Sequence, residues 1–327
     1  MKTYIARRLL LSLPVFVGLL LFTFLLIRLQ PGGPFEASSA GFPLPENTRL
    51  SLERADGLDR PLHEQFGRYV LQIASGNLGP MLRTPFLTVN DVVVNALPVT
   101  LQLGVMAVVL GLVIGLPAGV YAAVHQNRSG DYIATLLAVI GVSVPTLAIA
   151  PFLVLFLGLR AGWFPIAFWG SQPPFTMGFL PEPSLEFLHH AALPVITLGI
   201  GVSAGIARLT RASLLEELGQ DYIRTARAKG LVEQLVVYRH ALKNALIPVV
   251  TLAGPLIVTI VPGSIVVELI FAINGLGRNM VQAIRTREYF LVSSSILIFS
   301  LLIVLGNLAA DLLYAWLNPR IHYDESD

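Results

Sequence analysis

Six long runs without Asp, Glu, Lys or Arg constrain what this 327-residue chain can fold into. A helix that crosses the hydrocarbon core of a bilayer needs about 20 mostly apolar residues. The six runs are close to that length and lie at Leu9–Ile27, Ala96–Val124, Tyr132–Leu159, Ala191–Ala207, Asn244–Val267 and Tyr289–Ala310. They predict an all-α, polytopic membrane protein with about six transmembrane helices.

The composition points to the same solvent. The chain is 54% hydrophobic and 13% charged, whereas a soluble domain carries roughly 25% charged residues. Such a chain lacks the polar side chains to cover itself in water, so membrane lipid is expected around it. The net charge is only +2, and the Lys and Arg residues are spread between the apolar runs. A nucleic-acid partner is therefore not expected.

The distribution of Lys and Arg predicts the orientation. Short cytoplasmic segments of membrane proteins are enriched in these residues, and seven of them fall in the segment Arg208–Lys243. Arg7 and Arg8 precede the first run, which has no Ala-x-Ala cleavage site after it and is read as an uncleaved span. Three Arg residues between Phe271 and Glu288 argue mildly against this orientation. The balance places both termini in the cytoplasm.

These spans divide the chain into four parts. Residues 1–30 form the cytoplasmic N-terminus and the first helix, residues 31–95 an extracytoplasmic region, residues 96–317 the core with a cytoplasmic loop at 208–243, and residues 318–327 a cytoplasmic tail. Apolar residues recur at helical spacing within Arg60–Ile73, which predicts a short amphipathic helix. That helix either lies on the membrane or docks on protein.

The stretch from Ser213 to Pro248 carries the most information about function. Leu215, Leu218, Tyr222 and Ala226 fall three or four residues apart, on one face of a predicted helix, while Glu217, Asp221 and Arg224 lie on another. Gly230 predicts the end of this helix, and Val232–Leu246 a second one. An amphipathic helix can rest on a membrane or insert into a groove of a partner, and mixed acids and bases favour the partner.

The segment Arg224–Gly230 resembles the Glu-Ala-Ala-x-x-x-Gly signature of ATP-binding-cassette importer permeases, in the form used by the oligopeptide and dipeptide branch. Arg224 stands where the wider superfamily has Glu. Further landmarks of that branch follow in order: Pro31–Pro34, Gly76–Pro80, Ser143-x-Pro145, Arg208-x-x-Arg211, Arg239–Leu242 and Pro319-Arg320. Asn274 and Asn318 depart from the pattern. The resemblance covers nearly the whole chain and is greatest to the B-type subunits of oligopeptide permeases.

The resemblance implies an importer-type permease fold in which the loop couples to an ATPase. It assigns that coupling to Asp221, Tyr222, Arg224, Thr225, Ala226 and Gly230. Asp221 and Arg224 would pair with charges on the ATPase, Ala226 would allow close packing in its cleft, and Gly230 would let the chain turn out of it. The resemblance also suggests an outer gate at Glu268, Phe271, Gly275 and Gly277.

It further implies the partners. These are a second homologous permease in a heterodimer, two ATPase subunits and an extracytoplasmic solute-binding protein, in a prokaryotic plasma (inner) membrane. The sequence contains no Gly-x-x-x-x-Gly-Lys phosphate loop, so ATP and Mg are expected on the partner subunits and no cofactor in this chain. A metal site is not expected, since the six histidines form no metal-spaced cluster. A catalytic site is not expected either.

The substrate is less constrained. Peptides follow from the resemblance, but the same importer class carries nickel chelates, glutathione and other small solutes. An alternative of another class is a stand-alone ion-coupled secondary transporter. Such carriers hold acids deep in the bundle, whereas Glu268 and Asp311 fall near the ends of their predicted spans. The sequence therefore favours ATP-driven import.

Overall fold

A computed structural model describes residues 2–29, 46–55, 60–81, 84, 86–170, 175–176, 180–181, 184–251 and 253–317. The segments Pro31–Pro34, Pro319-Arg320 and the predicted tail at 318–327 lie outside these residues. The regular secondary structure of the described part is helical except for a short antiparallel pair, β1 (Phe175–Thr176) and β2 (Leu180–Pro181). The predicted all-α class is confirmed.

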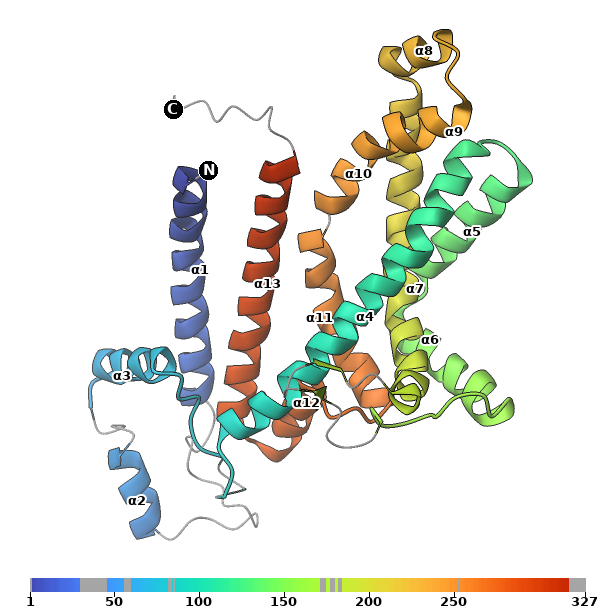
Figure 1. Ribbon diagram of the computed structural model, residues 1–327. Coiled ribbons are helices and arrows are strands. Elements are labelled where there is room, and N and C mark those ends of the chain that lie inside the picture. Colours follow the sequence, from blue (N-terminus) through green and yellow to red (C-terminus); the bar gives the residue numbers. More distant parts are fainter. Residues whose placement is uncertain are drawn as a thin grey trace. The chain divides into compact units, whose positions relative to one another are not determined.

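The helices follow the predicted spans and add several short elements between them. In chain order they are α1 (Lys2–Arg28), α2 (Glu46–Ala55), α3 (Leu62–Ala74), α4 (Val89–Val124), α5 (Ser129–Ser143), α6 (Thr146–Leu153), the π-helix η1 (Val154–Arg160), α7 (Leu185–Leu218), α8 (Asp221–Ala228), α9 (Glu233–Leu235), the π-helix η2 (Val236–Ala241), α10 (Leu242–Thr251), α11 (Ala253–Ile270), α12 (Leu276–Thr286) and α13 (Tyr289–Leu317). Figure 1 shows them on the ribbon.

The chain forms two compact units. One contains residues 1–100 and 274–304, and the other residues 101–273 and 305–327. This division follows contacts between residues, whereas the division drawn from the sequence follows sides of the membrane. The predicted boundaries at 30, 95 and 317 therefore stay predictions.

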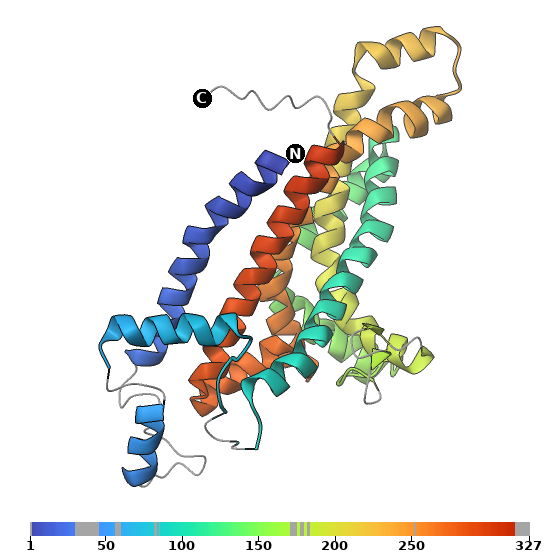
Figure 2. The same ribbon diagram turned by 60° about the vertical axis from the view of Figure 1, so that its left-hand side comes forward.

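In the first unit, α3 confirms the amphipathic helix predicted at Arg60–Ile73. It lies across the end of α1 (Figures 1 and 2). The Thr23 and Tyr69 hydroxyls share a hydrogen bond at 3.0 Å, and Arg28 Nε donates to Gln65 Oε1 at 2.8 Å. Phe24 packs edge-on against Phe66, with ring centroids 5.5 Å apart. Of the two predicted roles, docking on protein is thus realised within this chain.

In the second unit, the third predicted span is broken. The segments Ser129–Ser143 and Thr146–Arg160 are bent by 105° relative to one another, so the predicted run Tyr132–Leu159 forms two helical segments rather than one continuous helix. Pro145 precedes α6 and has no N–H to continue α5, and it disfavours helical backbone at Val144. Val144 accordingly has an extended conformation, with φ −83° and ψ 119°.

The described helices include clear membrane spans. Among the described residues, three helices are long and apolar enough to cross a bilayer: α4, α7 and the segment Tyr289–Ala310 of α13. The bent pair makes a fourth if it counts as one span. Two shorter apolar helices, Ser12–Arg28 and Ile260–Ile270, overlap the first and fifth predicted runs. The fifth run is divided between α10 and α11.

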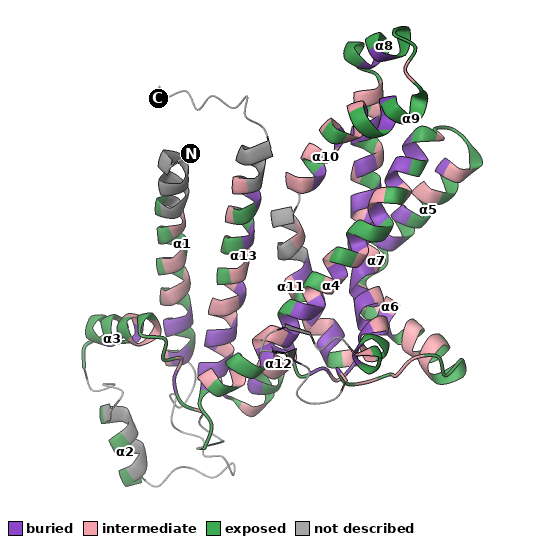
Figure 3. Ribbon diagram, viewed as in Figure 1, coloured by how far each residue is buried: buried purple, intermediate pink, exposed green. Residues whose placement is uncertain are grey.

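Helices α4, α5 and α7 pack closely because glycines face their neighbours. A Cβ atom on Gly119 of α4 would lie 2.6 Å from both Ala207 O and Thr210 Cβ of α7. A Cβ atom on Gly141 of α5 would lie 2.9 Å from Ala204 Cβ. Small residues let membrane helices approach in this way, which increases their van der Waals contact. Helix α7, which has buried residues from Phe187 to Leu214 (Figure 3), is the central helix of this bundle.

Candidate functional site

The 208–243 loop folds as two helical arms joined by a turn (Figure 2). Helix α7 ends at Leu218, and α8 begins at Asp221. The single helix predicted to carry Leu215, Leu218, Tyr222 and Ala226 on one face is therefore wrong. Gln220 has an extended ψ of 153°, and its carbonyl oxygen accepts the amides of Ile223 and Arg224 at 3.1 and 3.2 Å. The second predicted helix is confirmed, as α9, η2 and the start of α10.

An apolar cluster holds α8 against the rest of the second unit. Its buried members come from α4, α7, α8, η2 and α10: Val120, Ala123, Leu214, Ile223, Ala226, Val236, Val237, Ala241 and Ala245. Ile223 is fully buried, and only 8% of Ala226 is exposed. The small side chain of Ala226 is thus explained by packing inside this chain rather than by contact with a partner. Leu215 and Leu218 pack against the same cluster, although Gly219 and Gln220 separate them from α8.

Gly230 ends α8 in a way that requires glycine. Its φ is +76°, a left-handed conformation that glycine adopts without the steric cost of a Cβ atom. The amide of Gly230 donates to Arg227 O at 2.9 Å and that of Leu231 to Ala226 O at 3.4 Å. This pair of bonds is the Schellman motif, which is often accompanied by an apolar contact from the residue after the glycine. Leu231 makes such a contact with the cluster. The predicted helix stop at Gly230 is confirmed.

The opposite face of α8 is polar and exposed (Figure 3). The side chains of Asp221 and Arg224 are 95% and 74% exposed and form a loose ion pair at 3.3 Å. Thr225 is exposed as well. An exposed pair of this kind adds little stability. Fold stability therefore does not require these charges, which leaves them available to a partner.

A second ion pair joins α8 to α9. Arg227 donates to both carboxylate oxygens of Glu233, from Nε at 3.1 Å and from Nη2 at 2.6 Å. The hydrogen bond from Arg227 lowers the pKa of the Glu233 carboxyl, and the bond to Glu233 raises the pKa of Arg227. The pair closes the turn that follows α8.

Tyr222 connects both arms of the loop. Its hydroxyl donates to Glu217 on α7 and accepts a hydrogen bond from Asn244 Nδ2 on α10 at 3.0 Å. Burial raises the pKa of the Tyr222 phenol, and the bond to Glu217 raises it further. The hydroxyl therefore stays protonated at neutral pH and can donate. Tyr222 is one of the predicted coupling residues, but its hydroxyl is engaged inside the chain.

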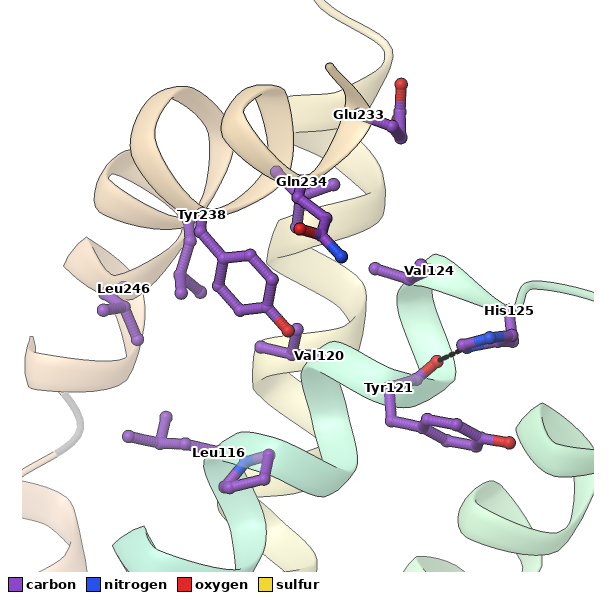
Figure 4. Close-up of a pocket in the computed structure, with 12 residues that line it drawn as sticks. Leu116, Val120, Tyr121, Val124, His125, Glu233, Gln234, Tyr238 and Leu246 are labelled. Atoms are coloured by element: carbon purple, nitrogen blue, oxygen red, sulfur yellow. Dashed lines mark hydrogen bonds between the residues drawn. The ribbon is translucent and has the colours of Figure 1, made fainter.

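A groove of about 720 Å³ lies beside the loop, between α4 and the α9–η2–α10 arm. Figure 4 shows Gln234 and Tyr238 pointing from that arm toward α4. The ring of His125 is hydrogen bonded to Tyr121 O at 3.0 Å. Val120 and Val237 line the groove and also belong to the buried cluster. The groove thus borders the apolar core of the loop directly.

The residues of the suggested outer gate lie in two different units. Glu268, in the last turn of α11, and Phe271, directly after that helix, are fully buried. Phe271 O accepts the amide of Phe168 at 2.8 Å. Gly275 precedes α12 and Gly277 is buried within it. The gate stays a prediction.

Two polar contacts in and beside the loop have no signal in the sequence. They are the hydrogen bond from Asn244 to Tyr222 and the ion pair between Asp131 and Arg211. The paired residues are 22 and 80 residues apart along the chain, so no local spacing signals them. Among the described residues, no group of three His, Cys, Asp or Glu side chains could hold a metal ion.

The fold and the loop define the class of protein: a membrane-spanning transport component of the importer-permease type. Two inward-facing crystal forms of the MetNI methionine ABC transporter have this fold. Each superposes with a TM-score of 0.56 over 69% of this chain and 96% of theirs, at 20% and 22% sequence identity.

The chain belongs to the family described as the binding-protein-dependent transport system inner membrane component, whose model matches residues 115–323. The oligopeptide transport system permease protein OppB of Haemophilus influenzae is 36% identical over 99% of this chain and all of its own length. The dipeptide transport system permease protein DppB of Bacillus subtilis is 37% identical over 91% of each.

The resemblance drawn from the sequence is therefore confirmed. The protein is a multi-pass permease subunit of an ABC transport system and not its ATPase. Membership in a binding-protein-dependent system implies a solute-binding protein and an ATPase as partners.

Proposed function

We propose that this chain forms half of the translocation pathway for oligopeptides or dipeptides. The support is the similarity to peptide permeases over nearly the full length, at 36–38% identity for the relatives OppB and DppB. The other half would be a second homologous permease. Two ATPase subunits, which would hold ATP and Mg, and an extracytoplasmic solute-binding protein would complete the importer in a prokaryotic plasma membrane, with both termini of this chain in the cytoplasm.

The observation that carries the coupling role is the two-sided character of α8. One face is fixed by Ile223 and Ala226 in the cluster, and the other presents the exposed charges of Asp221 and Arg224. A helix that packs on the chain with one face and exposes polar groups on the other is suited to docking on a soluble partner rather than to insertion into lipid. ATP binding would draw the ATPase subunits together and move α8, and with it the spans, in an alternating-access cycle.

Reconstitution of the complete complex in liposomes tests this function. We expect uptake of trialanine loaded on the binding protein to require ATP, and to be inhibited by other short peptides but not by nickel chelates or glutathione. Uptake of those solutes instead would change the substrate assignment and leave the importer class intact. Uptake by this chain alone, driven by an ion gradient, would favour the secondary transporter and overturn the proposal.

Arg224→Glu tests the coupling face separately. The side chain is exposed and its ion pair weak, so we expect normal insertion and assembly but a severalfold loss of substrate-stimulated ATP hydrolysis. Arg239→Glu is the matched control, because Arg239 is also exposed and lies on η2 in the same loop. Equal stimulation in wild type and Arg224→Glu would contradict an ATPase contact at this face.

A further inference from the structure

The ion pair between Asp131 and Arg211 joins two helices of the second unit. Arg211 on α7 donates from Nε to Asp131 Oδ1 at 2.6 Å and from Nη2 to Oδ2 at 2.7 Å. Only 3% of the Asp131 side chain and 27% of the Arg211 side chain are exposed. Planar, bidentate pairing of this kind fixes both distance and orientation. The pair therefore holds the start of α5 at one position along α7.

The Asp131 carboxylate also organises the turn that enters α5. Oδ2 accepts the amide of Asn127 at 3.0 Å, and Oδ1 accepts the Thr135 hydroxyl at 3.2 Å. Asn127 has a φ of +61°, an uncommon conformation for a residue other than glycine. Four hydrogen bonds thus converge on one carboxylate, which is close to its full accepting capacity. The α4–α5 turn, α5 and α7 share this one anchor.

The pair lies two turns before the end of α7, which leads through Gly219 and Gln220 into α8. The other residue of the pair, Asp131, lies at the start of α5. That helix is followed by the 105° bend at Val144 and Pro145 and then by α6. The close contact at Gly119 holds α4 against α7. Near the α8 end, the Asp131–Arg211 pair is the charge-assisted contact between α5 and α7 in the described part of the chain.

We propose that Asp131 and Arg211 are positioning residues that make α5 and the broken third span move with α7 when α8 is displaced. The inference rests on the proposed coupling role of α8 and adds the route by which its motion reaches the spans. Without the pair, α7 and α8 would follow the ATPase while α5 lagged behind. ATP would then be hydrolysed with less solute carried.

The test compares Arg211→Gln, Asp131→Asn and the double variant in the complete complex in liposomes. Each single variant leaves one buried or partly buried charge without its partner, which by itself can disturb folding. The double variant removes both charges and keeps the shapes, so it separates positioning from stability. The matched control is Arg208→Gln, since Arg208 lies one turn earlier on α7, is exposed and forms no ion pair with any described residue.

We expect the double variant to assemble and hydrolyse ATP, and to carry severalfold less trialanine per ATP than wild type, while Arg208→Gln matches wild type. If the pair were only structural, the double variant would recover the wild-type ratio, and that result would overturn the inference. A wild-type complex without ATP-dependent uptake would instead overturn the proposed function.

A distance measurement tests the inference even if the wild-type complex shows no ATP-dependent uptake. The chain has no cysteine, so spin labels can be placed on this subunit at Leu136→Cys of α5 and Lys229→Cys beyond α8, both exposed positions. We expect the separation of the labels to stay fixed in wild type when a non-hydrolysable ATP analogue binds to the complex, and to shift or broaden in the double variant. An unchanged separation in the double variant would overturn the inference.

Discussion

The hydroxyl of Tyr222 on α8 accepts a hydrogen bond from Asn244 Nδ2 on α10 at 3.0 Å. Because the same hydroxyl donates to Glu217 on α7, one side chain links both arms of the 208–243 loop. The apolar cluster beneath α8 is non-directional, whereas these two bonds fix the angle between the arms. Helix α8 is thus attached to the chain by packing and oriented by Tyr222.

Tyr222→Phe tests this orientation. The ring stays and the hydroxyl is lost, so we expect a stability loss of about 1 kcal/mol or less, as for a partly exposed hydrogen bond. The larger effect should be a lower ratio of solute carried to ATP hydrolysed, measured in liposomes. Tyr238→Phe is the control, because Tyr238 is 62% exposed. Equal ratios in the two variants would remove Tyr222 from the coupling path.

Gly230→Ala tests the turn after α8. No atom lies within 4 Å of a Cβ atom built on Gly230, so the cost comes from its φ of +76° alone, about 1 kcal/mol. We expect faster hydrogen exchange of the amides from Ile223 to Leu231. Gly219→Ala is the control, with an ordinary φ of −82°. If both variants exchanged at the same rate, the left-handed turn would not stabilise α8.

Ala226→Glu tests the buried face of α8. The carboxylate would enter the apolar cluster without a partner, a change that costs several kcal/mol. We expect α8 to detach and its arm to become sensitive to protease in the purified complex. Ala228→Glu is the matched control, since Ala228 is on the same helix and exposed. Protease resistance in Ala226→Glu would show that Ala226 does not pack within the chain.

The Arg227–Glu233 pair predicts a small effect of pH. The pKa of Glu233 is lower in the folded state because of Arg227, so its contribution is present above the usual carboxyl pKa and is lost as the pH falls through the folded pKa. Both side chains are about half exposed, which limits the contribution to less than about 1 kcal/mol. The thermal stability of wild type should approach that of Glu233→Gln below about pH 4 and exceed it near neutrality. An equal difference at both pH values would exclude the pair as its cause.

Much of the fold follows from local sequence properties. The apolar runs predict the spans because a helix in lipid must be long and apolar to satisfy its backbone and its surroundings. The sequence also predicts α3 and the end of α8 at Gly230, since amphipathic spacing and a left-handed residue are local requirements. Pro145 was visible as well, but a proline in a membrane helix can be tolerated. The sequence therefore locates the third span but does not predict the bend at Val144 and Pro145.

The organisation of the 208–243 loop could not be predicted in the same way. Leu215, Leu218 and Ala226 have helical spacing, yet Gly219 and Gln220 divide them between two helices that pack on one cluster. The apolar spacing indicates which residues are buried, but it does not predict how the chain turns between them.

The sequence by itself determined the membrane-spanning class, the family and the location of the polar loop, because these depend on composition, local spacing and motif order. Only the tertiary structure decided that Ala226 faces inward, that Tyr222 joins Glu217 to Asn244, and that Arg211 binds Asp131. These contacts join residues far apart in the chain, and they form only when packing brings their helices together, since the apolar surfaces that align the helices are not specific for any one pair of polar groups.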